Sequence, residues 1–120
     1  MQPHIRAIIA ASAHAILTGR KVAGLDDHHA DRHLRIAAEA RGEHLQGYDG
    51  ERASKFGGTL PELRDLGADA AINMTIEDGE ARGYDRSSST HFTARTTEQR
   101  VQLFDHGSET WFTYIVQVAP

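Results

Sequence analysis

The fold is decided by the stretch ARGYDRSSSTHFTA, residues 81–94, in which one alternating run ends and another begins. The first run stops at Asp85, a serine-rich segment follows, and Phe92 opens the returning run seven residues after the aspartate. The same spacing from an aspartate to a large apolar residue occurs five times: Asp27 to Leu34, Asp49 to Phe56, Asp65 to Ile72, Asp85 to Phe92 and Asp105 to Phe112. This internal repeat predicts a series of strands joined by similar turns.

Apolar and polar residues alternate through most of the chain after Gly19, for example in residues 72–77 and 112–118. Period two with one apolar face is typical of half-buried antiparallel strands. Turn dipeptides such as Asp78-Gly79 separate the runs. The predicted strands cover about residues 20–26, 32–40, 43–49, 53–60, 69–77, 79–85, 90–97, 99–105 and 110–118. Between Leu60 and Gly67 the shorter spacing and Pro61 predict a missing hairpin or a corner.

Residues 4–18 have a different period, which predicts an amphipathic helix. Ile5, Ile8, Ile9, Ile16 and Leu17 fall at helical spacing among alanines. Pro3 suits the first turn of this helix and Gly19 its end. We expect the helix to pack one face on a sheet.

Together these patterns predict a mainly β (α+β) fold in one domain, residues 1–120. The N-terminal helix precedes an antiparallel meander of about nine short strands over residues 20–118, because the long crossovers that parallel pairing needs are absent. Such a sheet tends to close on itself, so we predict a closed or nearly closed barrel with the helix over an open end or an edge. A two-layer β-sandwich is the alternative.

Composition excludes several classes of function. The net charge of −4 comes from 17 acidic and 13 basic side chains without a basic block, so we expect no nucleic-acid partner. The absence of cysteine excludes disulfides and thiolate catalysis and suits a reducing cytoplasm. The alanine-rich run 7–17 is interrupted by His14 and is too short to span a bilayer. We therefore expect a cytoplasmic protein that does not enter membranes.

The five aspartates of the repeat, Asp27, Asp49, Asp65, Asp85 and Asp105, each stand where a strand ends. A carboxylate in this place accepts hydrogen bonds from turn N–H groups, as in an Asx-turn, so we interpret the aspartates as structural staples of the turns. The alternative is a ring of carboxylates at one rim of the barrel that holds Ca²⁺ through oxygen ligands.

Three of the aspartates follow an aromatic residue, namely Tyr48, Tyr84 and Phe104. Strand alternation leaves two arrangements open. In one, the three rings close the core near the rim. In the other, they lie outside as an aromatic surface, beside Gly47 and Gly83, of a kind that binds partners or sugars. The second arrangement makes these residues the candidate ligand-binding set.

A cluster rich in histidine and aspartate occupies residues 26–33. Imidazole and carboxylate together suit Zn²⁺ and related ions, which makes Asp27, His28, His29, Asp31 and His33 the candidate metal ligands. However, His28 and His29 are adjacent and would point oppositely on an extended strand. His28 also matches His106 of the last repeat unit, and His33 matches His91. These matches favour a packing or surface role.

No catalytic motif is present: the chain has no Gly-x-Ser-x-Gly elbow, phosphate-binding loop or His-Glu-x-x-His sequence. We expect a non-catalytic binding domain, without a cofactor, for a protein partner or a small ligand at the barrel interior, the rim or the aromatic edge. One alternative is a metal-dependent or acid–base enzyme that uses the cluster from Asp26 to His33. Another is a structural protein that self-associates into homo-oligomers through edge strands or the helix.

Overall fold

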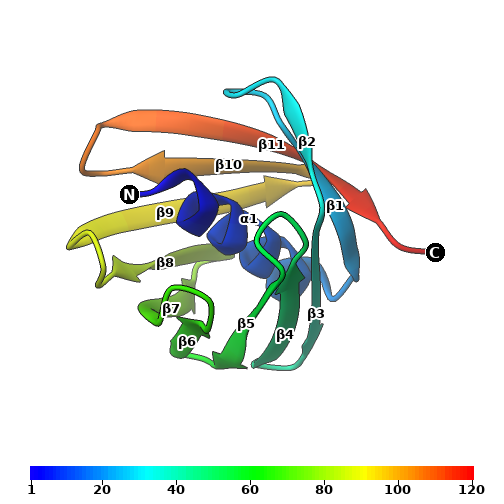
Figure 1. Ribbon diagram of the computed structural model, residues 1–120, viewed down its shortest axis with the longest axis horizontal. Helices are drawn as coiled ribbons and strands as arrows, with labels where there is room; N and C mark the ends of the chain where they lie inside the picture. The colour runs from blue at the N-terminus through cyan, green and yellow to red at the C-terminus, as the bar shows by residue number, and fades with distance from the viewer.

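The chain forms a closed antiparallel β-barrel around one helix (Figure 1). The computed structural model describes residues 1–120. Its elements are α1 (Pro3–Thr18), β1 (Val22–Asp27), β2 (Arg32–Leu34), β3 (Ile36–Arg41), β4 (His44–Asp49), β5 (Ser54–Thr59), β6 (Glu62–Asp65), β7 (Ala70–Glu77), β8 (Glu80–Asp85), β9 (Thr90–Thr97), β10 (Arg100–Asp105) and β11 (Thr110–Val118). Ten strands make the barrel and one short strand is additional. The predicted mainly β fold with a closed meander is confirmed.

Closure comes from β1, which pairs with β11 at one side and with β2 and β3 at the other. From β3 to β11 each strand pairs with its neighbour in the sequence. The strand expected over residues 32–40 is interrupted at Arg35, which separates β2 from β3. The segment Leu60–Gly67, expected to be a missing hairpin or a corner, contains the short strand β6 after a cis Leu60–Pro61 bond.

The helix runs through the barrel, not over its end or edge as we expected (Figure 1). Its buried residues are Ile5, Ala7, Ile8, Ile9, Ala10, Ala11, Ser12, Ala13, His14 and Ala15, which cover every side of the helix. A barrel of about eight strands is filled by its own side chains, and a wider one leaves room for more. The alanines of α1 make the helix thin enough to fill that room. No helix in the structure combines the length and the apolar character needed to cross a bilayer.

A polar side chain also lies inside the barrel. His14 is fully buried, and its Nε2 lies 2.9 Å from the backbone oxygen of Glu98 in the turn between β9 and β10. Because a carbonyl oxygen only accepts, Nε2 carries the proton and donates it. Burial lowers the pKa of His14 below its usual 6.5, with the Glu98 carbonyl opposing this effect. Burial therefore favours the neutral form of this imidazole in the folded protein.

Overpacking of α1 is the first test of the enclosed helix. Ala11→Leu should lower the free energy of unfolding by about 2 kcal/mol, because the barrel wall leaves no space for three more carbon atoms. The same substitution at the exposed Ala23 of β1 should change it by less than about 0.5 kcal/mol. Urea denaturation of the two variants makes the comparison. Equal effects would contradict a helix buried on all sides.

The neutral His14 also predicts how stability depends on pH. The unfolded chain takes up a proton at His14 as the pH falls through about 6.5, whereas the folded chain takes it up only at a lower pH. Stability should therefore fall by up to about 1.4 kcal/mol per pH unit below this value. Denaturation curves over this range should be flatter for His14→Gln, which keeps a donor but does not titrate. A slope unchanged by the substitution would contradict this assignment.

Candidate functional site

All five repeat aspartates lie at one rim of the barrel, where the N-terminal end of α1 emerges; we call them the rim aspartates. They are almost completely buried and face inward. In each, Oδ1 accepts a backbone N–H from the turn that follows: His29 and Ala30 for Asp27, Glu51 for Asp49, Gly67 for Asp65, Ser87 for Asp85, and Gly107 and Ser108 for Asp105. These bonds satisfy turn donors that have no partner in the β-ladder.

The second oxygens of three rim aspartates face cations. Arg52 Nη1 lies 3.0 Å from Asp65 Oδ2 and 3.4 Å from Asp49 Oδ2. The amino group of residue 1 lies 3.6 Å from Asp105 Oδ2. His4 Nε2 lies 3.5 Å from Asp65 Oδ2, but desolvation, aided by Arg52, lowers the pKa of His4. Arg52 therefore supplies most of the positive charge that offsets the negative charges of Asp49 and Asp65.

The two remaining rim aspartates differ from these and from each other. Asp85 Oδ2 accepts the hydroxyl of Ser88 at 2.7 Å, and its Oδ1 accepts the hydroxyl of Ser87 at 2.6 Å. Asp27 Oδ2 has no hydrogen bond or ion pair. No group of three or more His, Asp or Glu side chains is placed to hold a metal ion, at this rim or elsewhere. The carboxylates thus bind turns and cations of the chain itself.

The five candidate metal ligands of residues 26–33 are not brought together. Asp27 turns into the barrel rim, whereas Asp26 points outward and lies 2.9 Å from Nδ1 of His33. The ring of His29 packs edge-on against Phe112, with 4.7 Å between the ring centroids. His28 and Asp31 are exposed in the turn. Alternation along β1 separates the two adjacent aspartates, as expected for a strand.

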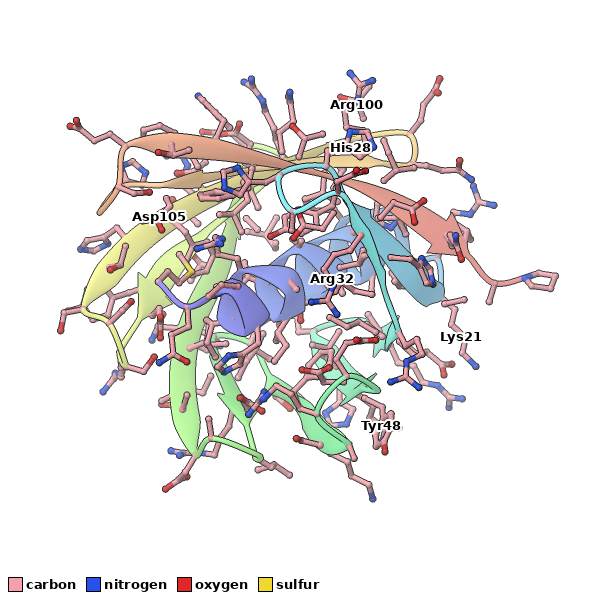
Figure 2. All side chains as sticks on the ribbon, turned by 45° about the horizontal axis from the view of Figure 1, so that its top comes forward. Lys21, His28, Arg32, Tyr48, Arg100 and Asp105 are labelled. Atoms are coloured by element: carbon pink, nitrogen blue, oxygen red, sulfur yellow. The ribbon has the colours of Figure 1, made fainter.

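The candidate ligand-binding aromatics lie on the outer face of the barrel, the second arrangement that the sequence left open. Because the rim aspartates face inward, the residue before each of them faces outward. Tyr48 is 47% exposed and points away from α1 (Figure 2). Tyr84 packs at a tilt against His91 of β9, and Phe104 against Trp111 of β11, with 4.7 and 5.0 Å between the ring centroids. The three lie on β4, β8 and β10, so they do not form one surface.

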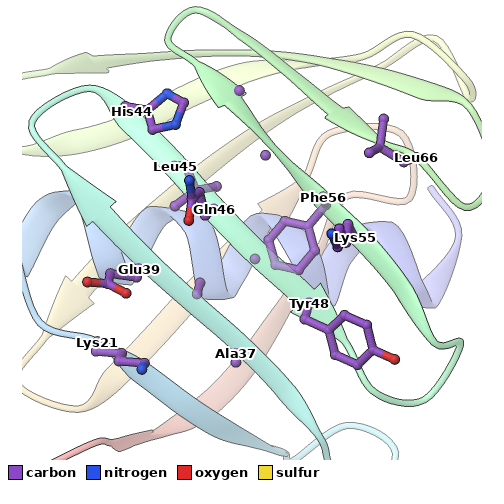
Figure 3. A pocket seen from close by; sticks show the side chains of 14 residues that line it. Lys21, Ala37, Glu39, His44, Leu45, Gln46, Tyr48, Lys55, Phe56 and Leu66 are labelled. Atoms are coloured by element: carbon purple, nitrogen blue, oxygen red, sulfur yellow. The ribbon is translucent and has the colours of Figure 1, made fainter.

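Tyr48 and Tyr84 each line a shallow groove on the outer face. Both tyrosines occupy the same position of the repeat, directly before a rim aspartate. The Tyr48 groove, of about 670 Å³, lies over β3, β4 and β5 (Figure 3). The Tyr84 groove, of about 690 Å³, lies over β7, β8 and β9. Polar residues also line them: Lys21, Glu39, His44, Gln46 and Lys55 in the first, and Asn73, Thr75, Arg82, His91, Thr93 and His106 in the second. Phe104 lines neither groove.

A glycine and a phenylalanine lie under each groove. Gly47 pairs with Phe56 across the ladder, and Gly83 pairs with Phe92. A Cβ at either glycine would overlap the phenylalanine ring on the inner side of the wall. At Phe104 the equivalent residue is Leu103, paired with Phe112. The Gly-Tyr-Asp sequences at 47–49 and 83–85 were therefore the available signal for the grooves, which sequence reasoning noted without predicting a groove.

Comparison with known proteins adds no assignment. A scan against protein-family models and searches of curated proteins and solved structures find no significant match to this chain. Aromatic rings with neighbouring donors and acceptors on an open surface can hold a polar ligand, and no metal centre accompanies them.

Arg52 provides a test of the rim. Arg52→Met should lower the free energy of unfolding by about 2 to 3 kcal/mol, because Asp49 and Asp65 stay buried without their shared cation. The matched control is Arg64→Met, which removes an exposed pair with Asp69 and should cost less than about 1 kcal/mol. Chemical denaturation measures both. If the two variants lose equal stability, Arg52 does not hold the rim together.

Proposed function

We propose that this chain is a non-catalytic binding domain that holds neutral oligosaccharides in the Tyr48 and Tyr84 grooves. The single observation that carries the proposal is the same groove at two equivalent positions of the pattern, each with a tyrosine ring beside polar side chains. A side chain that served only packing would be expected inside the wall, and Tyr48 is about half exposed.

The chemistry of a sugar matches this arrangement. One face of a pyranose ring carries mainly C–H groups and packs on an aromatic ring, while the hydroxyls at its edge need donors and acceptors. In the Tyr48 groove, Lys55 of β5 lies directly opposite Tyr48 across the ladder, and Gln46 of β4 pairs with Glu39 of β3. These side chains supply both donors and acceptors at the edge of the tyrosine ring.

The barrel interior is not the favoured place for a ligand. The buried side chains of α1 fill it, so a ligand there would need to displace the helix. The outer grooves need no rearrangement of the fold. They lie over β4 and β8, four positions apart in a ten-strand barrel, and face different directions. One short oligosaccharide therefore does not reach both grooves, and we expect two independent binding events per chain.

Titration with a panel of neutral gluco-, manno-, galacto- and N-acetylglucosamine oligomers tests the proposal. We expect ¹H–¹⁵N chemical-shift changes around both tyrosines for at least one sugar. Calorimetry should then give a stoichiometry of two sugar molecules per chain. Tyr48→Ala should weaken one site by about tenfold and Tyr84→Ala the other, because each removes the aromatic platform.

Trp111→Ala is the matched control, since Trp111 is 46% exposed but lines neither groove. Its sugar binding should equal that of the unmodified chain. The proposal fails if no sugar of the panel shifts groove resonances, or if the two tyrosine variants bind as tightly as the unmodified chain.

A protein partner is the second candidate, favoured by an aromatic patch on β9, β10 and β11 that adjoins the Tyr84 groove, where Phe104 packs on His106. The guanidinium of Arg95 lies 4.6 Å above the ring of Trp111, and Phe104 contacts the same ring. Exposed tryptophan and arginine are the residues that most often dominate protein interfaces. The ten strands of the barrel have no free edge, so association of two copies would use such a face or the outer edge of the short strand β2.

A further inference from the structure

A small cavity of about 310 Å³ lies at the rim, separate from the two outer grooves. It is bounded by the first turns of α1, by the hairpin of β1 and β2, and by the turn after β4. Its apolar wall includes Ala7, Leu34 and Ile36, and Asp27 lines its polar part. The cavity has the volume to enclose a small organic group, and one part of it carries negative charge.

Asp27 is the rim aspartate whose side chain is not fully used by the protein. It is 8% exposed, and its Oδ1 accepts the N–H groups of His29 and Ala30. Its Oδ2 accepts no hydrogen bond and forms no ion pair within the chain, unlike the Oδ2 atoms of the other four rim aspartates. This oxygen is open to the cavity, so a cationic donor placed there can form a charge-assisted hydrogen bond with it.

The arginines at positions 32, 35 and 52 form ion pairs with other carboxylates, whereas Arg6 forms none. Arg32 Nη2 lies 3.1 Å from Glu51 Oε1, and Arg35 Nε lies 3.0 Å from Glu51 Oε2. Arg52 bridges Asp49 and Asp65. Arg6 donates to the backbone oxygen of Met1 and lies over the ring of Phe112. Of the three carboxylates that line the cavity, Asp27, Asp49 and Glu51, only Asp27 therefore forms no ion pair with a cation of the chain.

We propose that this cavity binds a primary alkylammonium, whose ammonium group donates to Asp27 Oδ2 and whose short alkyl chain lies along Leu34 and Ile36. A primary amine is protonated at neutral pH and supplies three donors on a narrow stem. A divalent cation does not fit, because it needs several oxygen ligands and the cavity offers a single free one.

The first experiment is an NMR titration of the full chain with n-butylammonium chloride. We expect shifts at Asp27, Ala30 and Leu34. Two probes of equal length, 1-butanol and sodium butyrate, should leave these resonances unchanged, because they lack the cation. The proposal is overturned if n-butylammonium causes no shift at the cavity, or if 1-butanol causes the same shifts. This comparison needs no variant.

Asp27→Asn supplies the second experiment. The asparagine oxygen still accepts the N–H groups of His29 and Ala30, while the charge at the cavity is lost. The dissociation constant of n-butylammonium should rise roughly tenfold to a hundredfold, as expected for a hydrogen bond between charged groups. Asp85→Asn is the matched control, since Asp85 does not line the cavity. Equal affinity in the two variants would overturn the proposal.

Two further measurements identify the source of the amine. Nα-acetyl-lysine amide tests whether a lysine side chain reaches the cavity, and 1,4-diaminobutane tests a free diamine. Binding of only the second supports a small-molecule ligand, and binding of both supports an alkylammonium site open to proteins as well. If neither binds, the proposal is overturned. Tyr48→Ala should not alter any of these results, so the amine site and the saccharide grooves can fail independently.

Discussion

The enclosure of α1 by a closed barrel is the constraint on which the rest of the structure depends. Every inward side chain shares one interior with a complete helix, so volume on the wall and volume on the helix must complement each other. The helix supplies alanines at positions 10, 11 and 13, and the wall places Phe56 and Phe92 against glycines 47 and 83. The thin helix and the glycine–phenylalanine pairs both result from the need to fit the wall side chains and the helix into one interior.

Electrostatics at the rim complements this packing. The N-terminal end of a helix carries a partial positive charge, and here it emerges among five inward carboxylates, an arrangement that stabilises both. Each rim aspartate also satisfies the N–H groups of its turn. The carboxylates face inward because those donors lie on the inner side, and Arg52 offsets the charge that the helix end does not. The rim thus joins helix, turns and strands.

The sequence predicted the strands because alternation and the aspartate spacing are local signals. It did not predict where α1 lies: the isoleucines at 5, 8 and 9 define one apolar face, and the alanines opposite suit either solvent or a tight interior. Strand alternation shows that Tyr84 and Asp85 face opposite ways but not which one faces inward. That choice depends on turn donors that come together only in the folded chain.

Strand β6 was missed because its four residues contain a single large apolar side chain, Leu63.

Because side chains fill the interior, a ligand would bind at the outer face or at the rim. On the outer face the lining residues recur along the sequence, whereas at the rim the unit of Asp27 differs from the others. Residues that recur, such as Tyr48 and Tyr84, form similar grooves, which suits repeated weak binding of one kind of ligand. A residue that departs from the pattern has surroundings that do not recur in the other units. Asp27 follows Asp26 and not an aromatic residue, and a short, separate strand follows its turn. In this unit no cation or serine hydroxyl of the chain reaches Asp27 Oδ2, so this oxygen stays free.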